Sequence, residues 1–266
     1  MPVVTPSAFS RVPPPGTPAG DERRDQFYHD LLAILGPTQL LWTPETGDTT
    51  TSTSRDRYGV TLTYDATVAS RFSPLGSLWA LDFDGTDDEA DTPDLARFSF
   101  GDGNADQPFS IVALVNPDTV AAGDRVLLAK ENSAAAEEYR FQIATANPEL
   151  VLTDESASAI ISVIASTVSV VGTWTLVAAT YDGSGSNMGL NIYTDGVSDI
   201  SSRSASGTYV AMENTAALVH LGARYTTKET FLNGKMAFVA LTGKALSPDE
   251  NLAIKELVNA VADLSL

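Results

Sequence analysis

The sequence predicts an all-β protein, an antiparallel sandwich or jelly roll, with one helix before it and one helix after it. Segments rich in Val, Ile, Tyr, Phe and Thr recur from residue 38 onward, without helical patterns between them. Gly, Asp, Asn and Pro separate these segments. Asp182-Gly183 and Asp195-Gly196 are strong turn signals, because glycine accepts a positive φ angle.

Composition limits the classes of function. The 266 residues include 34 acidic and 16 basic side chains, a net charge of −18, which disfavours nucleic acid as a partner. No apolar run approaches the roughly 20 residues of a membrane helix, so no membrane span is expected. Cysteine is absent, and His29 and His220 lie far apart in the chain, so we expect no metal and no cofactor. The start, Met1-Pro2-Val3-Val4, lacks the pattern of a signal peptide.

The first twenty residues predict an extended arm. They contain one charged residue, Arg11, and six of the fourteen prolines, which remove backbone donors and favour extended conformations. Such an arm is either a tail without contacts or a segment that docks on a partner or on a neighbouring copy.

A helix is predicted over Asp21–Leu35. Phe27, Leu31, Ile34 and Leu35 form one apolar stripe, and Gly36-Pro37 ends the helix. The stripe either closes one end of the domain core or packs on another subunit. With Arg11 it forms the candidate anchor, so we predict an anchoring arm and helix at residues 1–37.

The predicted strands follow in chain order. Trp174–Tyr181 and Met236–Leu241 are apolar at nearly every position, which suits central strands covered on both faces, and Trp174 is expected in the sandwich core. Tyr139–Ile143 alternates apolar and polar residues, as a half-buried strand does. The clearest strand segments are Phe109–Val115, Val126–Ala129, Tyr139–Thr145, Leu150–Leu152, Ile160–Ile164, Trp174–Tyr181, Leu190–Tyr193, Leu218–Ala223 and Lys235–Leu241.

The last helix has a marked start. Ser247 is a cap, Pro248 occupies the first helical position, and Glu250 completes a capping box. Ile254, Leu257, Val258 and Val261 then form its apolar stripe.

Several motifs together resemble the laminin-G-like family of concanavalin A-like jelly rolls. They occur in the family's order from about Thr38 to the C-terminus, which gives a predicted domain at residues 38–266. The motifs are Leu81–Asp88, Phe109–Ile111, Val126–Lys130, Gly172–Asp182, Ile192–Gly196, Leu221–Tyr225, Phe231–Lys235 and Ala245–Pro248. The resemblance implies a concanavalin A-like jelly roll, a fold that serves lectins, adhesion modules, glycosidases and virion proteins.

The acidic segment Asp82–Asp94 is the first place to look for chemistry. Asp82, Asp84 and Asp87 have the spacing of the Glu-x-Asp-x-x-Glu signature of jelly-roll glucanases, but all three are Asp and Gly85 interrupts the strand. Carboxylates of this segment could also bind Ca²⁺. We expect a solvated acidic loop, no catalytic residues and no metal.

Two pairs of residues are candidates for glycan contact. Asp124-Arg125 and Arg224-Tyr225 are expected on loops at one end of the sandwich, where the resemblance places sugar binding.

The sequence therefore favours a non-catalytic attachment protein. Its arm and jelly roll resemble tailed-phage virion proteins, so the expected setting is the virion surface, as a head decoration or a fibre-like appendage. The expected partners are capsid or tail proteins and further copies in a homo-oligomer, with cell-surface glycans as ligands. The alternatives are an extracellular carbohydrate-binding module and a jelly-roll glycosidase.

Overall fold

The computed structural model describes residues 19–65, 71–120, 123–133, 135–225 and 230–266. The predicted arm and its Arg11 lie outside the described residues. Helix α1 spans Ala19–Leu35 and helix α2 spans Pro248–Ala262. The strands are β1 Thr38–Trp42, β2 Thr51–Thr53, β3 Thr61–Tyr64, β4 Phe72–Leu75, β5 Leu78–Asp84, β6 Ala90–Thr92, β7 Phe109–Pro117, β8 Asp124–Glu131, β9 Glu137–Ala144, β10 Asn147–Asp154, β11 Ala159–Ile164, β12 Thr175–Tyr181, β13 Leu190–Thr194, β14 Val197–Ser198, β15 Ser202–Ser206, β16 Val219–Leu221 and β17 Asn233–Thr242.

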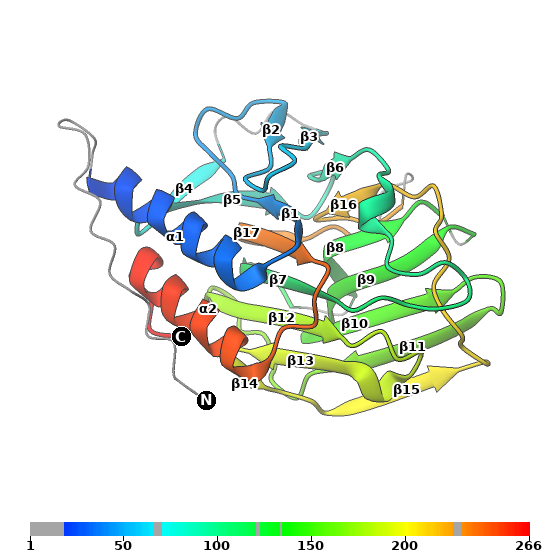
Figure 1. The fold of residues 1–266 in the computed structure, drawn as a ribbon. Coiled ribbons are helices and arrows are strands. Elements are labelled where there is room, and N and C mark those ends of the chain that lie inside the picture. Colours follow the sequence, from blue (N-terminus) through cyan, green and yellow to red (C-terminus); the bar gives the residue numbers. More distant parts are fainter. Residues whose placement is uncertain (1–18, 66–70, 121–122, 134, 226–229) are drawn as a thin grey trace.

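These strands form two antiparallel sheets packed face to face, so the predicted all-β sandwich is confirmed (Figure 1). Within the described residues, sheet A has eight strands in the order β14-β13-β12-β7-β17-β5-β4, with β1 also paired to β17. Sheet B has nine strands in the order β15-β11-β10-β9-β8-β16-β6-β3-β2. Neighbours distant in sequence, such as β7 and β17, pair over eight registered positions, as a jelly roll requires.

The inner core lies between the two sheets. Alternate residues of each strand point inward, and aromatic side chains fill the centre. Phe109 stacks on Phe100 with ring centroids 4.6 Å apart and lies 5.2 Å from Tyr139. The Tyr139 hydroxyl donates to the Phe98 carbonyl at 2.8 Å, so its polar atom is satisfied inside the core.

A second core covers the outer face of sheet A. Both helices lie on that face (Figure 1), and the central strands of the sheet are buried on both sides, as their continuous apolar pattern predicted. In α1, Phe27, Leu31 and Leu35 are buried, and the Phe27 ring lies 5.8 Å from that of Phe238 in β17. Ile34 packs against the same cluster.

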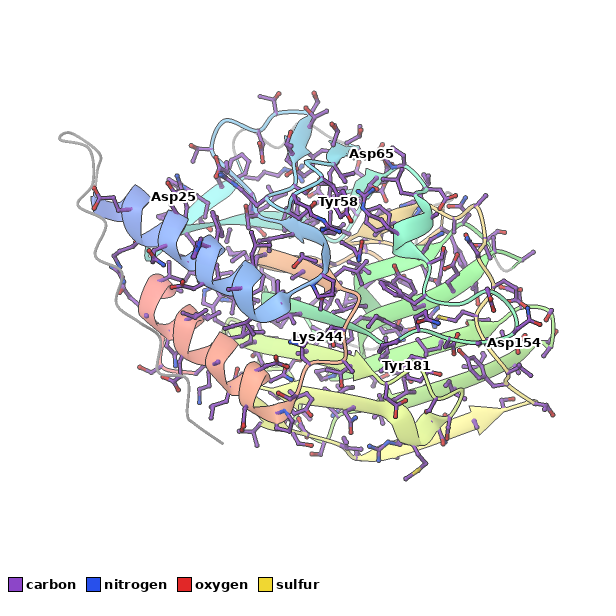
Figure 2. The ribbon with its side chains drawn as sticks, viewed as in Figure 1. Asp25, Tyr58, Asp65, Asp154, Tyr181 and Lys244 are labelled. Carbon is purple, nitrogen blue, oxygen red and sulfur yellow. The ribbon has the colours of Figure 1, made fainter. Side chains whose placement is uncertain are left out.

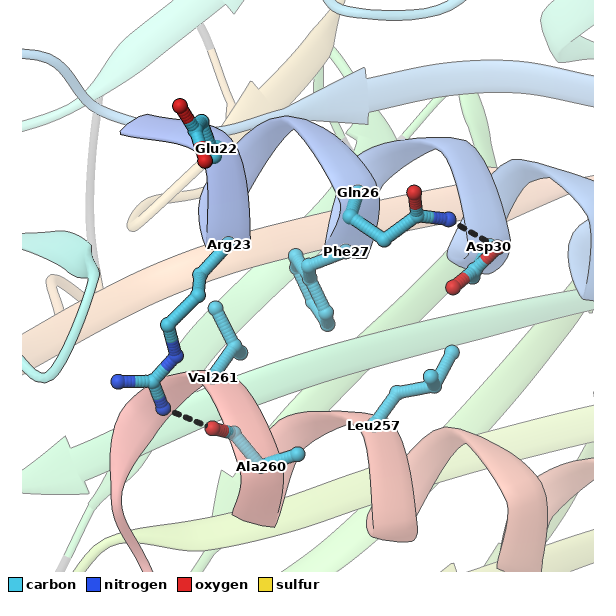
Figure 3. Close-up of a pocket in the computed structure, with 8 residues that line it drawn as sticks. All are labelled: Glu22, Arg23, Gln26, Phe27, Asp30, Leu257, Ala260 and Val261. Carbon is cyan, nitrogen blue, oxygen red and sulfur yellow. Dashed lines mark hydrogen bonds between the residues drawn. The ribbon is translucent and has the colours of Figure 1, made fainter. Parts of the chain in front are cut away.

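The prediction that this stripe is open to another subunit is therefore wrong. Phe27, Leu31 and Leu35 are buried by the chain's own sheet and by α2, and Ile34 is partly buried there, which is the other interpretation of the stripe. Figure 3 shows Phe27 pointing toward Val261 and Leu257 of α2. The predicted division between residues 37 and 38 does not correspond to a break in packing, because α1 belongs to the second core.

The region around Lys244 joins the two helices to sheet A. Its ammonium donates to the Ile34 carbonyl at 3.2 Å and pairs with Glu250 of α2. Figure 2 labels Lys244 near the ends of the two helices. The predicted capping box of α2 is confirmed, since Ser247 and Glu250 exchange hydrogen bonds.

Trp174 is half-buried against the second core, not in the sandwich core where it was expected. Helices thus occupy the outer face of sheet A, which leaves sheet B and the loops for a ligand.

Candidate functional site

A polar pocket lies between the end of β1 and strand β2. Its volume is about 310 Å³, a size that suits a small ligand. Every residue that lines it carries a hydroxyl, a carboxylate or a guanidinium group: Thr43, Glu45, Asp48, Ser52, Thr53, Ser54 and Arg55. Such a lining can donate hydrogen bonds to a ligand and accept them from it.

Hydrogen bonds from neighbouring residues fix the position of the Asp48 carboxylate in the pocket. Asp48 accepts hydrogen bonds from the Glu45 backbone N–H at 3.1 Å and the Tyr64 hydroxyl at 3.3 Å. The Trp42 indole donates to the same Tyr64 oxygen at 3.1 Å. Burial raises the pKa of Asp48 to about 6, although the hydrogen bond from Tyr64 opposes this shift. Asp48 can therefore change protonation state close to neutral pH.

Helix α1 also supports the pocket. Arg55 pairs with Glu45, and its guanidinium lies 5.1 Å from the ring centre of Tyr28 in α1. The Arg55 backbone N–H donates to the Leu41 carbonyl of β1 at 2.7 Å. The pocket thus depends on contacts of the segment after β2 with α1 and β1, the two elements that precede it in the chain.

A second polar region lies on the outer face of sheet B. Arg140, Ala129, His220 and Asp91 stand directly opposite one another on β9, β8, β16 and β6, so their side chains share one face. Tyr139, next to Arg140, belongs to the inner core, which identifies this shared face as the outer one.

A chain of charged contacts crosses this face. Arg140 bonds Glu131 at 2.6 Å and Gln142 at 2.7 Å, and the Arg224 guanidinium lies 4.0 Å from Glu131. Burial raises the pKa of Glu131 to about 7 against the attraction of Arg140 and Arg224. On this polar side of β9, Arg140 is half-buried and Gln142 is buried, so the strand is less exposed than the predicted half-buried strand.

Among the residues that the structure describes, two groups of side chains could hold a metal ion. In Glu89, Asp91 and His220, one ligand atom from each residue lies within 4.8 Å of the others, and the His220 Nδ1 is 2.9 Å from a Glu89 oxygen. Glu89 and Asp91 also have other interaction partners. His220 lies on strand β16, as predicted.

The second such group, Asp84, Asp87 and Asp88, lies in the acidic segment that was expected to be a solvated loop. Asp84 and Asp87 are exposed, but Asp88 is buried, so the expectation is wrong for Asp88. Asp88 pairs with Arg71 and accepts a hydrogen bond from the Asp84 backbone N–H at 2.8 Å. Asp82 lies 3.6 Å from Lys235. The motif carboxylates Asp82 and Asp84 thus have cationic neighbours, since Arg71 is also 3.8 Å from Asp84.

The structure does not join the four predicted glycan contacts into one site. Arg224 and Tyr225 lie together, with the guanidinium 4.2 Å from the ring centre, and the Tyr225 hydroxyl donates to Glu137. Asp124 and Arg125 begin β8 instead of lying on a loop, and Arg125 donates to the Asp124 carbonyl at 2.8 Å. The contacts of the two pairs therefore lie at opposite ends of β8.

Sequence reasoning missed the polar pocket and the charged region of sheet B. A signal for the second existed, because Glu89, Asp91 and Asp94 repeat the carboxylate spacing of the glucanase signature. Asp94, however, bonds Lys130 at 3.1 Å, and Lys130 stands opposite the inner-core residue Tyr139. The Asp94 carboxylate therefore bonds an inward-facing lysine and does not join Glu89 and Asp91 on the outer face.

Comparisons with known proteins agree with the fold. A family model described as the concanavalin A-like lectin/glucanases superfamily matches residues 84–250. No curated protein sequence matches the chain. Among solved structures, the receptor-binding domain of botulinum neurotoxin type G is similar, with a TM-score of 0.55 and 14% identity over 84% of this chain and 51% of that one.

The binding domain of Paraclostridial Mosquitocidal Protein 1 is similar to the same extent. Its TM-score is 0.59 at 10% identity, covering 84% of this chain and 52% of that one. The chain spans about half the length of these solved chains, and at such identities the likeness shows the fold alone. None of the described helices is long and apolar enough to cross a membrane.

Proposed function

Because the chain belongs to the concanavalin A-like lectin/glucanases superfamily, we propose that it is a non-catalytic attachment domain that binds carbohydrate in the polar pocket beside β1. The lining of that pocket is the observation that carries the proposal. It is polar throughout, whereas a site for an apolar ligand is lined mainly by hydrophobic side chains.

The chemistry of a sugar matches this lining. Adjacent sugar hydroxyls both donate and accept hydrogen bonds, so they need carboxylates to accept from them and hydroxyl or guanidinium groups to donate to them. Glu45 and Asp48 supply the acceptors, while Arg55 and the Ser and Thr hydroxyls supply the donors. One similar toxin domain is named a receptor-binding domain and the other a binding domain. These names describe those two proteins, and a binding function for this chain accords with them.

Two contacts favour binding over hydrolysis. A retaining glycosidase needs one carboxyl group as acid and a second as nucleophile. Glu45 pairs with Arg55, and Asp48 bonds the backbone N–H of Glu45, so both groups have structural partners. The raised pKa of Asp48 favours hydrolysis as the second candidate, because a general acid needs this property.

The setting we propose is the surface of a phage virion, with an extracellular binding module as the alternative. The proline-rich segment before α1 supports this setting, since extended arms suit assembly on a larger particle. With the α1 stripe buried, residues 1–18, including Arg11, are the part of the predicted anchor that remains. The partners would be capsid or tail proteins and further copies of the chain.

A binding experiment with matched variants tests the pocket. Thr53 lines it and is exposed, whereas Thr51 is also exposed on the same strand but does not line it. On an immobilised glycan panel, we expect the wild type and Thr51→Arg to bind the same sugars. Thr53→Arg should lose about tenfold or more in affinity. Equal binding by both variants, or binding of no glycan by the wild type, would refute the proposal.

A further inference from the structure

The carboxylate of Asp48 is the unbalanced charge of the polar pocket. Glu45 and Arg55, the other charged residues of the lining, pair with each other. Among the residues that the structure describes, no lysine, arginine or histidine forms an ion pair with Asp48. With Asp48 ionised, the pocket therefore carries one negative charge that no ion pair of the described fold neutralises.

The hydrogen bonds of Asp48 leave one of its two oxygens for a ligand. The Glu45 backbone N–H and the Tyr64 hydroxyl both donate to Oδ2, at 3.1 Å and 3.3 Å. Within the described part of the chain, Oδ1 accepts no hydrogen bond. Each oxygen of an ionised carboxylate is an acceptor, so Oδ1 can accept from a bound ligand while the contacts of Oδ2 remain.

The environment of Asp48 makes its unpaired charge costly. Asp48 is half-buried, and burial raises its pKa to about 6 although the hydrogen bond from Tyr64 lowers it. A ligand that fills the pocket removes further water from the carboxylate, which adds to the cost unless the ligand brings a positive charge. A neutral sugar brings no charge, and an acidic sugar adds repulsion.

An ammonium group on the ligand meets this requirement. A hydrogen bond between an ammonium and a carboxylate is about twice as strong as one between neutral groups. A sugar in which an amine replaces one hydroxyl places a cation beside Asp48. Its other hydroxyls remain available to Arg55 and to the serine and threonine hydroxyls of the lining. N-acetylation of the amine removes its charge and therefore this advantage.

We propose that the polar pocket selects sugars with a free amine, whose ammonium group pairs with Asp48, over N-acetylated, neutral and acidic sugars. The inference rests on the proposed function, since it names the class of sugar that the same pocket binds. Glucosamine is the simplest ligand of this class, and N-acetylglucosamine differs from it only at the amine.

The first test compares ligands on the wild-type chain at pH 7, by NMR titration with glucosamine, N-acetylglucosamine, glucose and ethanolamine. We expect the dissociation constant of glucosamine to be about tenfold or more below those of the other three. Equal dissociation constants for the three sugars would overturn the inference and leave the carbohydrate proposal standing. Binding of no sugar, or ethanolamine binding as tightly as glucosamine, would overturn both.

A matched pair of variants tests the role of Asp48. Asp48→Asn removes the charge and keeps the shape, whereas Asp249→Asn makes the same change of net charge at an exposed position in the first turn of α2. This control is needed because a chain of net charge −18 attracts any cation. We expect Asp48→Asn to bind glucosamine and N-acetylglucosamine within about twofold of each other and Asp249→Asn to keep the wild-type preference. A preference that survives in Asp48→Asn, or that falls equally in both variants, would overturn the inference.

The pH dependence of binding tests the same contact without a variant. Burial raises the pKa of Tyr64 and of Tyr28, which lies beside Arg55, so both tyrosines keep their protons, and Glu45 stays paired with Arg55. Asp48 gains a proton as the pH falls from 7 to 5 and then no longer attracts an ammonium group. We expect the dissociation constant of glucosamine to rise about threefold or more over this range and that of N-acetylglucosamine to change by less than about twofold. Glucosamine binding that is unchanged or tighter at pH 5 would overturn the inference.

Discussion

Replacing Leu31 by Ala tests whether α1 is part of the folded domain. Leu31 has no exposed surface and packs in the second core among residues of α2 and sheet A. Truncating a fully buried leucine costs about 2–5 kcal/mol, through lost burial and the cavity that remains. For a chain of this size, a loss of about 3 kcal/mol corresponds to a fall in melting temperature of roughly 6–12 °C.

The matched control is Leu252→Ala, the same substitution at a 45% exposed position on the other helix. We expect it to cost less than about 0.5 kcal/mol. Urea denaturation followed by circular dichroism gives the free energy of unfolding of both variants and of the wild type. A decrease in the free energy of unfolding of less than about 1 kcal/mol for Leu31→Ala would refute the burial argument, because an apolar stripe exposed for a partner would tolerate the change.

Three further predictions concern ionisation and metal binding. Burial raises the pKa of Asp199, but hydrogen bonds from Ser166, Thr167 and Thr194 outweigh it and lower the pKa to about 2. Its stabilising effect is thus present above about pH 4 and lost as the pH falls toward 2, so Asp199→Asn should flatten the acid limb of the stability profile. An unchanged acid limb would contradict this. The effect of pH on stability through Glu131 is opposite to that through Asp199, because the pKa of Glu131 rises from 4.5 to about 7 on folding. The contribution of Glu131 to stability therefore declines as the pH rises through that range. Urea unfolding of Glu131→Gln at pH 5 and 8 should lack this decline, and a decline equal to that of the wild type would refute it. Millimolar Ca²⁺ or Zn²⁺ should move the melting temperature by less than about 2 °C, whereas a larger, chelator-reversible shift would make Glu89, Asp91 and His220 a metal site.

Much of the sandwich was predictable because its signals are local. The capping box at Ser247 and Glu250 and the apolar runs of β12 and β17 depend on residues close in sequence, and all three form as predicted. The strand ends were less accurate. β8, for example, extends from Asp124 to Glu131, beyond the apolar residues that marked it, because pairing with β9 continues past them.

Features that depend on distant contacts were missed. β15, Ser202–Ser206, has no apolar pattern and is a strand only because it pairs with β11. The stripe of α1 showed that something covers Leu31 and its neighbours, but amphipathicity does not tell which surface does so. The polar pocket likewise joins Arg55 to Tyr28, 27 positions earlier in the sequence, and no motif marks such a contact.

The mass of a bound glycan tests the central claim most directly. The wild type is incubated overnight with a glycan that it retains, and the bound and free sugars are weighed by mass spectrometry, with Asp48→Asn in parallel. A non-catalytic binding domain leaves every glycan intact in both samples. Glycans shortened by whole sugar units with the wild type, and intact with Asp48→Asn, would show that the pocket hydrolyses its ligand and would contradict the account.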